Sequence, residues 1–124
     1  MSFLFTGIDH VQLAAPEDCE QAARSFYADL LGWKEITKPD NLIKRGGAWF
    51  QCGTHQVHIG VQNDFIPAKK AHPAFQVQNL NALREYLHHK GVQVIDDHAR
   101  SEEGVQRFYL NDPFGNRLEF LEWL

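Results

Sequence analysis

Two histidines, His10 and His72, open similar strand-like runs in the two halves of this 124-residue chain. In the run GIDHVQLAAP, Val11 and Leu13 alternate with His10 and Gln12, so the polar and apolar pairs belong to opposite faces of a strand. The run AHPAFQVQN repeats the pattern from His72, which stands 62 positions after His10 (72 − 10). Imidazole can bind a metal ion or carry a proton near neutral pH. The polar face of these runs is therefore either exposed to water or part of a binding site.

The elements that must position these histidines also repeat. PEDCEQAARSFYADLLGW and NLNALREYLHHKGV both place apolar residues at helical spacing and end near a glycine, Gly32 or Gly91. Three more strand-like runs follow in each half, WKEIT, GAWFQCG and QVHIGVQ in the first, and VQVID, QRFYLND and NRLEFLEW in the second. The order β-α-β-β-β thus occurs twice, which indicates two copies of one unit. We expect one domain over the whole chain, with module one at 7–62, a linker at 63–70 and module two at 71–124.

Sorting the strand residues by face gathers a polar set on the side away from the helices. Alternate apolar residues, such as Val57 and Ile59, are expected to pack on the helix of their own half. The other face carries His10, Gln12, Trp49, Gln51, His58, Gln62, His72, Gln76, Arg107, Tyr109, Arg117 and Glu119. We predict an α+β fold in which the modules form a curved mixed sheet around a central cavity lined by this face. Because unpaired buried polar groups cost about 1–3 kcal/mol each, such residues must be paired or bound.

Charge, hydropathy and cysteine content exclude several classes of protein. A formal net charge of −4 argues against nucleic-acid binding, which needs clustered Lys and Arg. No apolar run approaches the length of about 18 residues that a membrane span requires, and MSFLFTGIDH lacks the regions of a secretory signal. Cys19 and Cys52 form no CxxC pair and suit free thiols in a reducing compartment. We expect a cytoplasmic protein without nucleic-acid or membrane partners.

The chain resembles the vicinal-oxygen-chelate superfamily, which includes glyoxalase I, fosfomycin-resistance, extradiol dioxygenase and bleomycin-resistance proteins. The resemblance covers nearly the whole chain and rests on IDHVQL, FYADLLGW, AHPAFQV and FYLNDPFGNRLEFLEW. The last run is the most specific, because it joins two strands through an Asp-Pro-x-Gly-Asn turn. In that turn Pro113 presets φ and Gly115 accepts a positive φ. The resemblance implies a glyoxalase-like fold.

Members of this superfamily that hold a metal place one ligand on the first and one on the last strand of each module. Carried over by position, the resemblance implies the ligands His10 and His58 in module one, and His72 and Glu119 in module two. Three imidazoles and one carboxylate suit a divalent Zn, Ni, Fe, Co or Mn ion and do not suit Ca or Mg. Without His58, the other three would form a two-His, one-carboxylate face with open positions. Taken alone, His10 would more readily be a solvated histidine or one satisfied in the core, and the repeat with His72 reverses that reading.

The chemistry that the resemblance implies is chelation of a small substrate through two oxygens by an ion that acts as a Lewis acid. Glu119 or His58 would then move a proton. Arg107 could hold an anionic group of the substrate, or could instead pair with the acidic loop at 101–103. Aromatic residues on the same face would wall the pocket or simply fill the hollow of the sheet. The substrate-binding residues expected on this basis are Gln12, Trp49, Arg107 and Tyr109.

We expect a homodimeric, metal-dependent lyase, isomerase or transferase of the glyoxalase type, whose metal face can be completed across two chains. The run SEEGVQRFYLNDPFGN is close to fosfomycin transferases, although Arg107 replaces a small hydroxyl residue and their basic residue after the final strand would fall beyond Leu124. Bacterial glyoxalase I has a carboxylate at the position of His58. The alternatives are a metal-free sequestering protein of the bleomycin-resistance type and a small extradiol dioxygenase.

Overall fold

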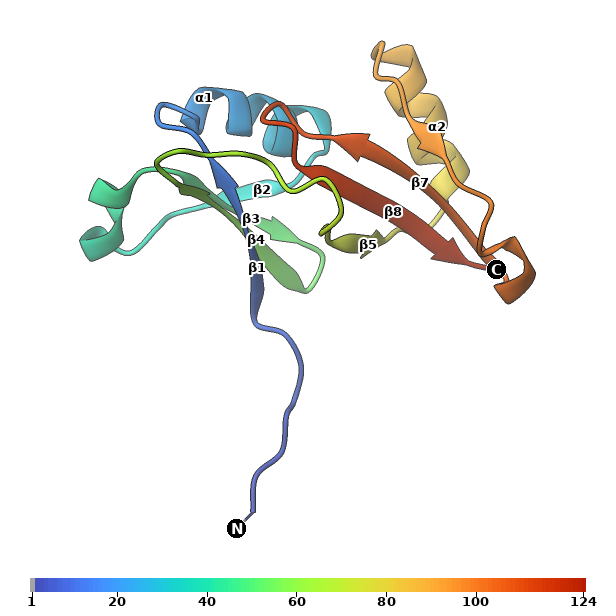
Figure 1. Ribbon diagram of the computed structural model, residues 1–124, viewed down its shortest axis with the longest axis horizontal. Helices are drawn as coiled ribbons and strands as arrows, with labels where there is room; N and C mark the ends of the chain where they lie inside the picture. The colour runs from blue at the N-terminus through green and yellow to red at the C-terminus, as the bar shows by residue number, and fades with distance from the viewer. Residues whose placement is uncertain (1) are drawn as a thin grey trace. The chain divides into compact units, whose positions relative to one another are not determined.

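A computed structural model describes residues 2–124 (Figure 1). The chain divides into two compact units, one up to Ile66 and one from Pro67 to Leu124, and each carries its own four-stranded mixed sheet. We call them unit one and unit two. The strands and helices of each follow the order β-α-β-β-β, with short extra helical turns. The predicted α+β fold of two repeated modules is confirmed.

The sheet of unit one positions the first two histidines. It contains β1 (His10–Ala15), β2 (Lys34–Ile36), β3 (Ala48–Cys52) and β4 (His55–Val61), in the spatial order β1-β4-β3-β2. The parallel β1–β4 register pairs Val11 with Val57 and Leu13 with Ile59, so the predicted apolar residues share one face. Val57 and Ile59 are each 1% exposed. His58 has the opposite parity in β4 and therefore belongs to the other face.

The first helical run contains two types of helix. It begins as α1 (Glu20–Ala23) and continues as the π-helical turn η1 (Arg24–Leu30), which ends just before Gly32 at a φ of +77°. Tyr27 is fully buried and stacks on Trp33 and against Phe50. The sequence pattern predicted one continuous helix here, because its apolar spacing does not distinguish an α-helix from a π-helical turn.

A 3₁₀ helix that the sequence did not predict, η2 (Asp40–Arg45), leads into β3 through two glycines. Gly46 and Gly47 have φ values of +74° and +83°, which favour glycine. A Cβ on Gly47 would also collide with the backbone oxygen of Ile59. Glycine therefore lets this turn lie directly against β4.

Unit two repeats the pattern. Its elements are β5 (Ala74–Gln76), α2 (Leu80–His89), β6 (Ile95–Asp96), η3 (Ser101–Glu103), β7 (Val105–Asn111) and β8 (Arg117–Trp123), with the strands ordered β5-β8-β7-β6. Phe108 and Leu118 in the sheet and Leu80 and Leu87 in α2 are fully buried. Strand β6 is shorter than the predicted run VQVID, and η3 occupies the stretch 101–103 that was predicted as an acidic loop.

Two side chains, those of Asn79 and Glu122, cap the N-terminus of α2. Asn79 is the N-cap of α2. It has a φ of +67°, and its Oδ1 accepts a hydrogen bond from the Ala82 N–H. The Glu122 carboxylate accepts from the backbone N–H groups of Asn79 and Leu80, at 2.9 Å each. These bonds lower the pKa of Glu122. Glu122 thus serves to cap the helix.

The Asp-Pro-x-Gly-Asn turn between β7 and β8 is closed by one carboxylate. Asp112 Oδ1 accepts from the backbone N–H groups of Phe114 and Asn116, at 2.9 and 2.8 Å, and Oδ2 accepts from the Asn116 side-chain amide. Asp112 and Asn116 are only 5% and 7% exposed. The Asp and Asn residues of this motif therefore have a structural role, which is to close the turn.

Both cysteines are free thiols, and Cys19 is buried. Burial, with a smaller effect of the adjacent Glu20, raises the pKa of Cys19 to about 11. Within residues 2–124, none of the helices combines the length and the apolarity needed to cross a membrane.

Candidate metal centre

Strands β1 and β4 bring His10 and His58 together on the polar face of unit one. Their rings stack with centroids 4.2 Å apart at 18°, and the His58 ring also stacks on the Trp49 indole at 3.7 Å and 2°. His58 is 4% exposed. Burial lowers the pKa of His58. The neighbouring His10 and Lys38 lower it further, and the negative charge of Asp9 opposes the shift. His58 is thus a buried imidazole within an aromatic stack.

The Nδ1 atoms of His10 and His72 each face a hydrogen-bond acceptor. His10 Nδ1 lies 2.9 Å from Asp9 Oδ2, and His72 Nδ1 lies 2.8 Å from the backbone oxygen of Lys70. A protonated Nδ1 that donates to such an acceptor leaves Nε2 with the lone pair in the neutral ring. Nε2 is therefore the atom through which His10 can bind a metal ion. In His72, Nε2 faces Glu119 Oε1, which an ion bound between them would have to replace as its partner.

Unit two brings His72 and Glu119 together, although they are far apart in sequence. His72 lies just before β5, and the parallel β5–β8 register pairs Ala74 with Glu119. His72 Nε2 is 2.9 Å from Glu119 Oε1. Glu119 is 3% exposed, so its side chain has few contacts to water.

Cationic and phenolic groups surround the Glu119 carboxylate. Arg107 Nη1 lies 3.5 Å from Glu119 Oε1. Burial, followed by a hydrogen bond to Glu119, raises the pKa of Tyr109. The Tyr109 ring meets the His72 ring edge-on at 5.2 Å, and the Arg117 guanidinium lies 3.9 Å from its centroid. Two residues predicted to bind substrate, Arg107 and Tyr109, therefore contact a predicted metal ligand.

Arg107 has several partners in unit two. Besides Glu119, its Nη2 pairs with Asp97 at 3.3 Å, and its Nε is buried without a hydrogen-bond partner. The acidic partner in the loop is thus Asp97, which precedes the stretch 101–103 considered from the sequence. A substrate anion would have to share or displace these carboxylates.

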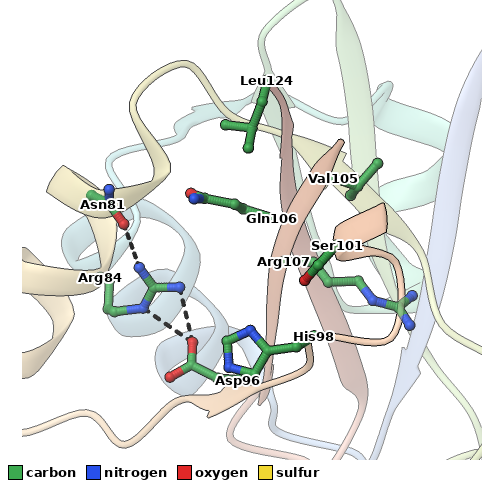
Figure 2. Close-up of a pocket in the computed structure, with 9 residues that line it drawn as sticks. All are labelled: Asn81, Arg84, Asp96, His98, Ser101, Val105, Gln106, Arg107 and Leu124. Atoms are coloured by element: carbon green, nitrogen blue, oxygen red, sulfur yellow. Dashed lines mark hydrogen bonds and ion pairs between the residues drawn. The ribbon is translucent and has the colours of Figure 1, made fainter. Parts of the chain in front are cut away.

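A pocket of about 290 Å³ lies beside α2 and β7 in unit two (Figure 2). Arg84 crosses it, donating to Asp96 at 2.9 and 3.1 Å and to Asn81. Arg107 contributes to the lining, but Figure 2 shows its guanidinium pointing away from the Arg84–Asp96 pair. This pocket is therefore distinct from the His72–Glu119 pair.

Comparison with known proteins now identifies the fold family. The sequence profile of the Glyoxalase/Bleomycin resistance protein/Dioxygenase superfamily matches residues 7–120. The chain belongs to this superfamily. The resemblance predicted from the sequence motifs is thereby confirmed. A crystal structure from Bacillus anthracis, assigned to the glyoxalase family, has 53% sequence identity and a TM-score of 0.95, with 100% of both chains covered.

More distant superfamily members share the fold. Lactoylglutathione lyase from Agrobacterium tumefaciens is 21% identical with a TM-score of 0.73, covering 94% of this chain and 93% of its own. A variant of the fosfomycin resistance protein FosX from Listeria monocytogenes, complexed with Mn(II) and 1S,2S-dihydroxypropylphosphonic acid, is 17% identical with a TM-score of 0.77. It covers 98% of this chain and 95% of its own. Comparison with curated proteins gave no significant match.

The candidate ligands of this superfamily member lie in two pairs, one in each unit. In residues 2–124, no three His, Cys, Asp or Glu side chains form a group that could hold a metal. Each unit nevertheless holds two of the predicted ligands in contact. Two ligands bonded at about 2.1 Å to one ion lie about 3.0 Å apart at right angles and about 3.4 Å apart in tetrahedral geometry. The 2.9 Å between His72 Nε2 and Glu119 Oε1 is close to the first of these separations.

Three neighbours of the candidate ligands were not predicted from the sequence. Asp9 directly precedes His10, and an acidic residue beside a histidine could have been noticed. Gln56, whose Oε1 lies 2.9 Å from His58 Nε2, shares the parity of His58 in β4, so the same period-two argument applied to it. The contact to the Lys70 carbonyl involves only a backbone atom, for which no residue type gives a signal.

Proposed function

We propose that this chain is a metal-dependent enzyme of the glyoxalase superfamily, acting as a lyase, isomerase or transferase on a small substrate that binds through two oxygens. The observation that carries the proposal is that each unit pairs its two candidate ligands, His10 with His58 and His72 with Glu119. This donor set suits Zn, Ni, Fe, Co or Mn. When bound, such an ion would supply Lewis-acid stabilisation of negative charge on substrate oxygens.

The side chains around these pairs have separable roles in the proposed enzyme. Asp9 and the Lys70 carbonyl orient His10 and His72 through Nδ1. Glu119 Oε1 or a ring nitrogen of His58 would accept and return a substrate proton. Tyr109 holds the Glu119 carboxylate through its phenol. Substrate-binding roles are proposed for Gln12, Trp49, Arg107 and Tyr109.

We also propose that the protein is a homodimer. Phe3, Leu4, Phe5 and Ile8 are 67%, 84%, 89% and 67% exposed, and this segment forms no helix or strand ahead of β1 (Figure 1). A contiguous apolar segment of this kind favours a protein partner. A second copy that covered Ile8 would lie close to His10, which supports a metal centre completed across two chains.

Elemental analysis of protein purified without chelator tests the metal proposal. The variants His10→Ala, His72→Ala and Glu119→Ala should each lose most of the bound metal while retaining the far-UV circular dichroism of the fold. The variant His58→Ala should lose less metal, because we assign His58 as the optional fourth ligand. The control His88→Ala changes an exposed histidine at the end of α2 and should retain full occupancy.

Two outcomes would contradict the proposal. Full occupancy in both His10→Ala and His72→Ala would place the metal elsewhere. Wild-type protein that binds no divalent transition metal would favour the metal-free sequestering protein. If metal is bound, a screen of hydroxy-ketones, phosphonates and catechols with each reconstituted ion would separate the lyase, transferase and dioxygenase classes.

A further inference from the structure

A small pocket opens beside the aromatic stack of unit one. Its volume is about 260 Å³, and its lining includes Gln12, Lys38, Arg45, Gly46, Trp49 and Gly60. Trp49 connects the pocket to the candidate metal centre, because its indole stacks on His58 at 3.7 Å. A volume below the roughly 300 Å³ of the smallest typical ligand pockets suits one group of a substrate.

The charge of this pocket is positive. Lys38 and Arg45 line it, and its lining contains no Asp or Glu, although the whole chain has a net charge of −4. The half-buried Lys38 ammonium donates to the Gly46 carbonyl, which leaves it further N–H donors. Arg45 forms no ion pair with any carboxylate in the part of the chain that the structure describes. Both cations can therefore donate to an added anion.

The backbone beside the pocket is held in place by Glu20. Gly47 donates its N–H to Glu20 Oε2 at 3.1 Å, and Glu20 is not among the residues that line the pocket. A Cβ on Gly60 would press against the Gln12 side-chain amide, so glycine there lets Gln12 lie close over β4. The close approach at Gly60 therefore places the neutral Gln12 amide in the pocket that Lys38 and Arg45 also line.

We propose that this pocket binds an anionic group of the substrate, a carboxylate or a phosphonate, between Lys38 and Arg45. Charge-assisted hydrogen bonds from an ammonium and a guanidinium recognise these groups, and the guanidinium can bind two of their oxygens at once. The placement of this group beside a catalytic metal rests on the proposed function, whereas binding of the anion itself requires no metal. The substrate class is thus a small oxygen-chelating molecule with an anionic end.

Titration with methylphosphonate and with acetate, followed by NMR, tests this pocket. The signals are the backbone amides of Gly46 and Gly60 and the indole N–H of Trp49, in metal-free and metal-loaded protein. We expect saturable shifts that Arg45→Gln and Lys38→Met each weaken about tenfold, as for the loss of one hydrogen bond to a charged group. The control Lys44→Gln removes the same charge from the residue next to Arg45, outside the pocket lining, and should change affinity little.

The outcomes separate this proposal from the metal proposal. The expected variant pattern with either anion supports the pocket, and the tighter anion identifies the substrate group, even if the protein never binds metal. Absent shifts, or equal weakening by Lys44→Gln and Arg45→Gln, would overturn the pocket. Binding that needs metal and ignores Lys38 and Arg45 would also overturn it while leaving the metal proposal intact. Because Lys38 also contacts Gly46, Arg45→Gln is the decisive variant if Lys38→Met disturbs the turn.

Discussion

Single contacts at Nδ1 set which ring nitrogen of the candidate ligands can face an ion. For His72 the contact is a backbone carbonyl, which substitution cannot remove. For His10 it is the side chain of Asp9, which is 95% exposed. Because an acceptor at Nδ1 orients a ligating imidazole and raises its basicity, Asp9 can influence the metal centre without touching it.

We therefore expect Asp9→Ala to lower metal affinity by about tenfold, the lower end of the range for such partners, because water competes for this exposed contact. Asp9→Asn retains an oxygen acceptor and should have a smaller effect. Competition with a chromophoric chelator measures both. An affinity unchanged in Asp9→Ala would show that the contact does not orient His10.

The Asp112 carboxylate also acts through individual atoms, in its case on the stability of the turn. In Asp112→Ala, the N–H groups of Phe114 and Asn116 would lose their acceptor. We expect a loss of about 2–4 kcal/mol in the free energy of unfolding, because unsatisfied buried donors cost about 1–3 kcal/mol each. Asp112→Asn keeps one oxygen and should lose less. Urea denaturation measures the difference, and equal stability of Asp112→Ala and wild type would contradict this account of the turn.

At the scale of elements, helix α2 is attached to unit two at both its apolar face and its N-terminus. Leu80 and Leu87 are buried in the core, while Asn79 and Glu122 satisfy the backbone N–H groups that the first turn leaves free. Glu122 lies in β8 and so links the helix to the strand that carries Glu119. Helix and sheet are therefore joined by a charged cap as well as by packing.

The cap predicts a pH-dependent stability. The folded-state pKa of Glu122 is lowered by its hydrogen bonds to the N–H groups of Leu80 and Asn79. Its stabilising contribution is therefore present above the unfolded pKa of about 4.3 and is lost as pH falls through the lower folded pKa. Glu122→Gln should lower the melting temperature at pH 7, and the gap to wild type should shrink below about pH 4.

A control for this prediction lies on the exposed surface of the same helix. Glu85→Gln removes an equal charge without touching the helix start, and the melting temperature should stay nearly unchanged. A gap between Glu122→Gln and wild type that persisted undiminished at pH 3 would rule out the charged cap.

At the scale of the whole molecule, each unit carries one pair of the proposed ligands. Unit one holds two imidazoles, and unit two holds an imidazole and a carboxylate. The exposed segment with Phe3, Leu4 and Phe5 directly precedes the first pair. A dimer that covers this segment would bring a second chain close to His10.

Mixing two inactive variants tests whether the centre is shared between chains. One variant carries His10→Ala and His58→Ala, and the other carries His72→Ala and Glu119→Ala. If each site combines unit one of one chain with unit two of its partner, heterodimers made by co-expression should regain one metal site per dimer. We expect this recovery, measured by elemental analysis of the purified heterodimer.

Two controls complete the experiment. Each variant alone should bind little metal. Sedimentation should show a dimer for the wild type at micromolar concentration, and a stable monomer would contradict the dimer proposal. Heterodimers that form but regain no metal would assign the complete centre to a single chain.

The sequence by itself determined the features that depend on local periodicity and local backbone geometry. The alternation of Val57, His58 and Ile59 assigns them to opposite faces of a strand, because side chains alternate at every residue. The N-cap at Asn79 was predictable because its side chain bonds to the backbone three residues later. The repeat and its motifs also identified the superfamily.

Only the tertiary structure decided which distant residues meet. Glu122 caps a helix whose first residue lies 42 positions earlier, Arg107 pairs with Asp97, and Trp49 stacks on His58. The positive pocket also required η2, a short helix whose sequence has no apolar periodicity to reveal it. The physical reason is that such contacts depend on strand register and on the path of turns through space. Periodicity assigns a residue to a face, but register and turn geometry decide which residue lies next to it.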